Sequence, residues 1–222
     1  MISELFPNIT SDELLKATYE TLYMTVLSLI GVIILGILLG LLLYLTNKGG
    51  LWENKFVYVV TSALVNIFRA IPFIILILLL FPFTNFLIGT VRGPNAALPA
   101  LIIGTAPFYA RLVEIALIEV NKGVVEAAKS MGARNSTIIF KVLLPESMPA
   151  LISGITVTSI ALIGYTAMAG VIGAGGLGNH AHYYGFMRRD FDVVFACTIV
   201  IVIIVFIFQF IGDFISKRID KR

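Results

Sequence analysis

A run of glycines late in the chain has the spacing of a nucleotide-binding fingerprint. Residues 173–178 read G-A-G-G-L-G and satisfy the pattern G-x-G-x-x-G. That fingerprint binds a dinucleotide only where a β-strand precedes it and an α-helix follows it. An apolar run of helical length precedes it here, so we expect no nucleotide. We expect the glycines to let the backbone turn back and to let helices pack closely.

Two histidines, His180 and His182, follow the glycine run with one residue between them. Zinc sites in proteins use three or four ligands, and no cluster of acids or cysteines accompanies this pair. We therefore expect no bound metal. Cys197 lies inside an apolar run, where packing as a small hydrophobic side chain is its expected role.

Arg69 is the charge whose position bears most on function. It interrupts a long apolar stretch, and an arginine at the centre of a bilayer costs roughly 2.5–3.5 kcal/mol on insertion scales. Asn66 lies one turn earlier on the same helical face, and Pro72 is able to kink the helix just beyond. Two interpretations stay open: these three residues face a translocation path, or Arg69 extends its side chain to the inner membrane surface.

Tyr165 and Met168 are three residues apart in a second apolar run and therefore share one face of a helix. A phenol beside a thioether is a chemically suitable surface for a substrate that carries its own thioether. The small residues Gly164 and Gly170 flank the pair and allow neighbouring helices to come close. Ordinary helix packing is the alternative, because methionine fills gaps well.

Residues 122–146 form the one substantial polar connection between apolar runs on the expected inner side. Ala127 and Ala128 are small, so another surface is able to approach this segment closely. Gly132 permits a sharp turn between two short helices, and Ser136 is able to cap the second one. Glu126 offers a charge for contacts at an interface. A pair of amphipathic helices lying on the inner leaflet is the alternative.

The composition places the whole chain in a membrane. Its 222 residues are 59% hydrophobic and 13% charged, with a mean hydropathy of +0.99, whereas soluble domains carry roughly 25% charged residues. Spanning helices need about 20 apolar residues. We predict one all-α domain over residues 1–222. Its five expected spans are residues 20–46, 57–83, 95–118, 148–171 and 192–215. An amphipathic helix, opened by a capping box at residues 10–13, is expected at the membrane surface and runs into the first span.

The distribution of lysine and arginine predicts an outside N-terminus and an inside C-terminus. The expected outer segments hold only Lys16, Arg92, Arg188 and Arg189. The expected inner segments hold the larger set, Lys48, Lys55, Arg111, Lys122, Lys129, Arg134, Lys141, Lys217, Arg218, Lys221 and Arg222. The formal net charge of +3 is small and scattered, so we expect no nucleic-acid partner.

The polar connection resembles the EAA loop of ABC importer permeases. Glu126-Ala127-Ala128, then three residues, Gly132, nine residues and finally Val142-Leu143-Leu144-Pro145 match that family pattern, and valine for isoleucine at 142 is the one departure. The resemblance implies that this loop docks into a groove on a separate ATP-binding subunit. The residues it assigns to coupling are Glu126, Ala127, Ala128, Gly132, Leu144 and Pro145.

The resemblance extends over nearly the whole chain and is most specific to the methionine-uptake permeases. The segments that carry it are residues 65–73, 104–111, 164–170 and 172–178. It implies a homodimer of this chain, two copies of the ATPase and an external lipoprotein that delivers substrate. In that branch, positions matching Tyr165 and Met168 face the path at the dimer axis.

The expected function is therefore that of a non-enzymatic permease subunit in the bacterial cytoplasmic membrane, importing methionine and related sulfur compounds by alternating access. The chain carries no G-x-x-x-x-G-K-[ST] loop, so ATP and Mg²⁺ are expected on the partner ATPase rather than on this chain. The alternatives are a permease for another small amino acid or organic solute, and a self-contained secondary transporter. The latter needs buried ionisable groups and usually an internal repeat, whereas this sequence offers Arg69 and no repeat.

Overall fold

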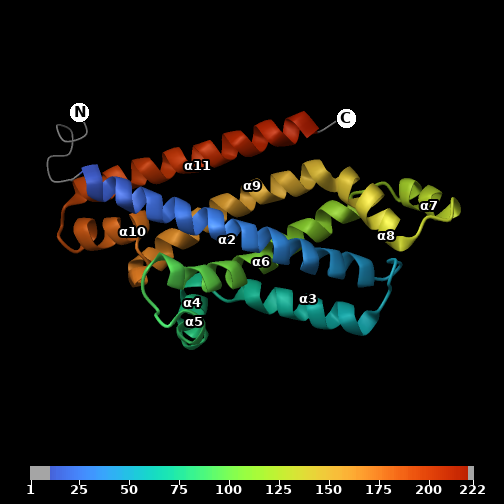
Figure 1. The fold of residues 1–222 in the computed structure, drawn as a ribbon, viewed down its shortest axis with the longest axis horizontal. Helices are drawn as coiled ribbons and strands as arrows, with labels where there is room; N and C mark the ends of the chain where they lie inside the picture. The colour runs from blue at the N-terminus through green and yellow to red at the C-terminus, as the bar shows by residue number, and fades with distance from the viewer. Residues whose placement is uncertain (1–10, 220–222) are drawn as a thin grey trace.

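Within residues 11–219, the part of the chain that the computed structural model describes, every regular element is helical (Figure 1). The elements are α2 (Ser11–Thr46), α3 (Lys55–Ala70), α4 (Phe73–Leu79), α5 (Phe81–Ile88), α6 (Pro94–Ile118), α7 (Lys122–Ser130), α8 (Asn135–Ile138), the π-helical η1 (Ile139–Leu143), α9 (Leu144–Ala169), η2 (Gly170–Ala174), α10 (Gly176–His180), η3 (Ala181–Phe186) and α11 (Phe191–Ile219). The predicted all-α fold is confirmed.

Helices α2 and α6 form the centre of the bundle and run side by side in the same direction (Figure 1). Three glycines of α2 allow this approach. A Cβ atom at Gly31, Gly36 or Gly40 would overlap Ile102, Tyr109 and Val113 respectively. Because membrane helices associate through close packing rather than through a hydrophobic driving force, this row of glycines fixes the register between α2 and α6.

Helix α2 is continuous from Ser11 to Thr46, 36 residues or about 54 Å. The amphipathic segment expected before the first span thus runs into that span as one helix, which confirms the predicted continuity. Its Leu14 and Ala17 are buried and belong to a cluster with Val193 and Cys197 of α11. One side of this segment therefore packs on the bundle, and its expected position at the membrane surface stays a prediction. Thr10, the expected capping residue, lies outside the described range.

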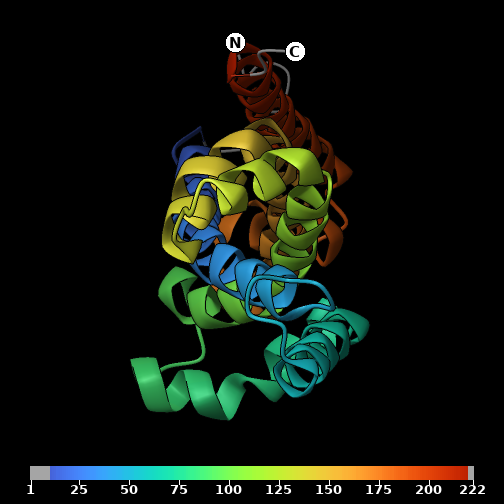
Figure 2. The ribbon, with the colours of Figure 1, turned by 90° about the vertical axis from the view of Figure 1, so that its right-hand side faces the viewer.

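The second expected span, residues 57–83, is not one straight helix. α3 ends at Ala70, and α4 leaves it at an angle of 107°. Pro72 causes the break, since proline lacks an N–H and its ring disfavours a continuing helix. Figure 2 shows α4 and α5 running sideways from the end of α3, beneath the bundle. The kink predicted at Pro72 is confirmed.

Four helical stretches in the described range are long and apolar enough to cross a bilayer, and α3 with α4 gives a fifth if the bent pair counts as one span. These stretches are Asp12–Thr46, Pro94–Ile118, Asn135–Ala174 and Phe191–Ile219. The third of them begins well before the expected residue 148, because η1 joins α8 to α9 without a break.

Candidate coupling and translocation sites

The polar connection forms a rigid helical hairpin at one end of the bundle (Figure 1). The side chain of Asn121 caps α7 by accepting a hydrogen bond from the N–H of Gly123 at 2.8 Å. Gly132 has φ +75° with open space around its Cβ position, so the turn needs glycine for its backbone conformation alone. The predicted turn between two short helices is confirmed. Ser136 does not cap the second helix, because α8 already begins at Asn135 after Arg134.

The hairpin is fixed to the bundle on one side and exposed on the other. Ala128, Ile138 and Leu143 are buried in a cluster with Leu117 of α6. The opposite side exposes Glu126 and Ala127 of α7, Met131 at 81% exposure, Phe140 and Pro145, while Leu144 is half-buried. Of the two small alanines, only Ala127 is therefore open to a partner.

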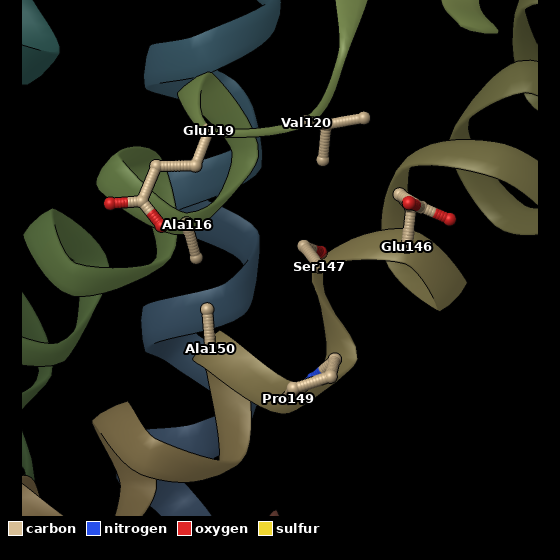
Figure 3. Close-up of a pocket in the computed structure, with 7 residues that line it drawn as sticks. All are labelled: Ala116, Glu119, Val120, Glu146, Ser147, Pro149 and Ala150. Carbon is tan, nitrogen blue, oxygen red and sulfur yellow. The ribbon is translucent and has the colours of Figure 1, made fainter. Parts of the chain in front are cut away.

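A pocket of about 100 Å³ lies where the hairpin joins the bundle (Figure 3). Glu119 at the end of α6 and Glu146 in the first turn of α9 stand on opposite sides of it. Ala116, Val120 and Ala150 line the rest with Ser147 and Pro149. The hydroxyl of Ser147 is turned back to the carbonyl oxygen of Leu143 at 2.8 Å. This pocket lies between the end of α6 and the start of α9, where the hairpin joins them.

Arg69 lies in the last turn of α3 and lines a cavity of about 130 Å³ beside the helix break. Tyr165 of α9 lines the same cavity, so the structure brings together two residues that are far apart in the sequence. Asn66 is exposed and donates from Nδ2 to the hydroxyl of Ser62 at 3.5 Å. Asn66 and Pro72 do not line this cavity, although both lie within four residues of Arg69.

Tyr165 and Met168 have different surroundings within one protomer. The Tyr165 ring stacks on Phe73 of α4 with centroids 4.6 Å apart, whereas Met168 is 46% exposed. The close approach expected at Gly170 is confirmed, since the backbone of Gly178 and Asn179 would meet a Cβ there. Within residues 11–219, a Cβ at Gly164 would meet nothing within 4 Å beyond the adjoining backbone of its own helix, so close packing at Gly164 stays a prediction.

The glycine run forms a turn that is bonded to the start of α2. Gly173, Gly175 and Gly176 all have positive φ, which confirms the expected reversal of the backbone. The N–H of Gly176 donates to Oε2 of Glu20 at 2.7 Å, and the N–H of Leu177 donates to the hydroxyl of Thr21 at 2.9 Å. Sequence reasoning missed Glu20 and Thr21, because no local pattern indicates a partner so far along the chain.

Arg111 and Glu114 form an ion pair within α6, with Nη1 of Arg111 and Oε2 of Glu114 2.6 Å apart. Glu114 is 1% exposed. A buried carboxylate in a spanning helix requires such a partner. Opposite charges three residues apart in an apolar helix were the signal for this pair, and the sequence interpretation assigned Arg111 only to the inner surface.

The two histidines lie at the opposite end of the bundle from the hairpin. His180 is buried and stacks on Tyr184, while His182 stacks on Phe186. Burial lowers the pKa of His180 from its ordinary value, and the charge of Glu13 partly opposes that shift. Among the described residues, no three His, Cys, Asp or Glu side chains lie close enough to hold a metal ion. Cys197 is buried, as expected.

A helical bundle with a rigid EAA-type hairpin at one end defines a class of transport protein. Residues 32–222 match the model of the binding-protein-dependent transport system inner membrane component family, and the chain belongs to that family. Family membership, predicted from the EAA pattern, is confirmed, and with it a multi-pass place in the membrane.

Individual members of this family that resemble the chain include permeases named for methionine transport. The chain is 67% identical over 222 residues to the methionine import system permease protein MetP of Bacillus subtilis (strain 168), covering 100% of both chains. It is 48% identical over 206 residues to the probable D-methionine transport system permease protein MetI of Pasteurella multocida (strain Pm70), covering 93% of this chain and 95% of the relative. A solved inward-facing structure of the MetNI methionine ABC transporter matches with a TM-score of 0.93 at 42% identity, covering 96% of this chain and 100% of that one.

Proposed function

We propose that this chain is the permease subunit of an ATP-driven importer that carries methionine, in either enantiomer, and related sulfur compounds. The observation that carries the proposal is the 67% identity to MetP of Bacillus subtilis along the full length of both chains. The 42% identity to the MetNI methionine transporter structure, over 96% of this chain, supports the same substrate class.

The coupling hairpin is the proposed docking site for an ATPase subunit. Its exposed Glu126 and Ala127 lie on α7, the helix that precedes the turn at Gly132, while buried Ala128 and Leu143 hold the hairpin on the bundle. A rigid connection transmits a push from the ATPase to α6 and α9 rather than absorbing it. Leu144 and Pro145 begin α9 directly behind the hairpin. ATP and Mg²⁺ would bind to the ATPase, and this chain would carry out no chemistry.

A second copy of the chain is the proposed partner across the translocation path. Val157, Gly164 and Met168 of α9 and Val171 of η2 are exposed at spacings that place them along one helical face. In two copies related by a two-fold axis, these faces would meet around the path, with Met168 near the constriction and Tyr165 behind it. Alternating access would follow when the two copies rock apart and together. An external lipoprotein would deliver substrate to the end that carries the glycine turn.

The proposed orientation places the coupling hairpin in the cytosol and the start of α2 outside. Support comes from Lys122, Lys129, Arg134 and Lys141, which all belong to the hairpin end of the bundle. In this orientation α3 and α4 together form the second of five spans, bent where the path would run.

Reconstitution of the purified complex tests the function. The permease with its ATPase and delivery lipoprotein is placed in liposomes, and methionine uptake and ATP hydrolysis are measured together. We expect methionine to stimulate hydrolysis and uptake to require ATP. Uptake that continues with the ATPase omitted would contradict the proposal and favour a secondary transporter, and stimulation by another amino acid but not by methionine would contradict the substrate.

A further inference from the structure

The break between α3 and α4 leaves backbone carbonyl groups at the end of α3 without backbone partners. Pro72 has no N–H to donate, and the N–H of Ile71 bonds to Ile67. The first turn of α4 bonds instead to the carbonyl oxygen of Pro72, from Ile75 at 2.9 Å and Leu76 at 3.0 Å.

Among the bonds of the described residues outside regular helices, none reaches the carbonyl oxygens of Phe68, Arg69 or Ala70. The C-terminal end of a helix carries a partial negative charge. It therefore attracts a cationic group such as an ammonium ion.

Arg69 brings a positive charge to the same turn. Its side chain is exposed, and no described carboxylate lies within ion-pair distance of it. A guanidinium presents five N–H donors in a planar fork that fits a carboxylate. One helix turn thus offers donors for an anion and acceptors for a cation.

The residues at the end of α3 line a cavity that also contains Tyr165, a residue of the predicted translocation path. It holds about 130 Å³, and Phe68, Arg69, Phe108 and Tyr165 are among its lining residues. A single water needs roughly 10–15 Å³ on a comparable measure, so there is room for the charged head of an amino acid. The stacked rings of Tyr165 and Phe73 close one side, and aromatic edges are favourable neighbours for a thioether sulfur.

We propose that this cavity binds the zwitterionic head of the transported amino acid. Arg69 pairs with its α-carboxylate, and the free carbonyl groups of Phe68 and Arg69 accept hydrogen bonds from its α-ammonium. The proposal rests on the proposed function, and it names how the same path recognises its substrate. A charge entering an apolar path is costly unless it is paired, so a site that pairs both charges lets a zwitterion pass and delays molecules that lack either one.

A purely structural role for Arg69 makes a different prediction. If the guanidinium only complements the negative end of its own helix, replacing it changes stability and leaves the discrimination among substrate analogues unaltered. The test must therefore read out substrate chemistry directly at the cavity, without the delivery lipoprotein, which makes its own selection.

Cysteine footprinting of the permease–ATPase complex provides that readout. Cys197→Ala removes the one native cysteine, and Ile71→Cys places a thiol on the cavity wall. The rate of N-ethylmaleimide modification is measured with methionine, with methioninol, which lacks the carboxylate, and with 4-(methylthio)butanoate, which lacks the ammonium. Arg69→Gln, Arg69→Lys and the distant control Arg92→Gln are compared in this background.

We expect methionine to slow the modification and both analogues to do so only at concentrations roughly tenfold higher or more. Arg69→Gln should raise the concentration of methionine needed for protection by a similar factor, so that methionine and methioninol protect at similar concentrations. Arg69→Lys should raise the methionine concentration by an intermediate factor, and Arg92→Gln should leave it unchanged. Equal protection by methionine and methioninol with Arg69 intact would overturn the proposal even if Arg69→Gln failed to assemble. Loss of ATP-dependent methionine uptake in the unmodified complex would instead overturn the proposed function.

Discussion

Glu20 and Gly176 are joined by a hydrogen bond of 2.7 Å from the backbone N–H of Gly176 to Oε2 of Glu20, although 156 positions separate them. Next to it, Thr21 accepts from Leu177. The start of the first long helix therefore holds the turn that follows α9. Any movement of α9 at this end has to carry the start of α2 with it or break these bonds.

Removing the Thr21 acceptor is expected to destabilise the protein. Thr21→Val keeps the shape but leaves the buried N–H of Leu177 without a partner, at a cost of about 1–3 kcal/mol. Thermal unfolding of the purified protein measures this. Thr18→Val is the matched control, because the Thr18 hydroxyl bonds only to Leu14 of its own helix. Equal melting temperatures for the two variants would contradict the assigned role of Thr21.

A bulky side chain at Ala127 is expected to uncouple the complex. Ala127 is exposed on α7 while its neighbour Ala128 is buried, so Ala127→Trp should leave the fold intact and block close approach of the ATPase. Co-purification with the ATPase and methionine-stimulated ATP hydrolysis are the measurements, with Ala127→Ser as the small control. If Ala127→Trp retains the ATPase and transports at the normal rate, the docking site lies elsewhere.

Met168→Ala is expected to change selectivity more than stability. Met168 is 46% exposed within the protomer, whereas Leu162 of the same helix is fully buried. Leu162→Ala should therefore lower the free energy of unfolding by about 2–5 kcal/mol, and Met168→Ala by clearly less. Met168→Ala should instead raise ATP hydrolysis without substrate or alter the ranking of methionine analogues. A destabilised Met168→Ala protein with unchanged selectivity would assign Met168 to packing.

The proposed orientation predicts labelling from opposite sides of the membrane. Met131 on the coupling hairpin and Met187 beyond η3 are exposed at opposite ends of the bundle. With Cys197 replaced by alanine, Met131→Cys should react with an impermeant maleimide only after the cells are opened, and Met187→Cys in intact cells. Reaction of both thiols in intact cells would require a different number of spans.

His180 is expected to make the end of the bundle opposite the hairpin sensitive to acid. Because burial lowers its pKa below the unfolded value of about 6.5, the unfolded chain takes up the proton first. The stability contributed by neutral His180 is therefore fully present above the unfolded pKa. It is lost as the pH falls through the lowered folded pKa. His180→Phe should reduce the drop in melting temperature between about pH 7.5 and about pH 5.5. His182→Phe is the control, and an identical drop in His180→Phe and the unaltered protein would contradict the prediction.

Local sequence patterns were enough for the parts of the molecule that depend on neighbouring residues. The apolar runs predicted the long helices, and Gly132 and Pro72 marked a turn and a kink that the structure contains. The predicted boundaries differ from the observed ones where helices continue into polar segments. η1 joins the hairpin to α9, and nothing in the local composition separates a helix that stops from one that continues.

The sequence by itself determined the helical membrane fold and the family, because both depend on residue type and short-range spacing. Only the tertiary structure decided that the chain turns by 107° at Pro72 and that Arg69 and Tyr165 line one cavity. It also decided that Glu20 holds the glycine turn. The reason is physical: a proline predicts that a helix breaks but not its new direction, which is set by the packing of distant helices.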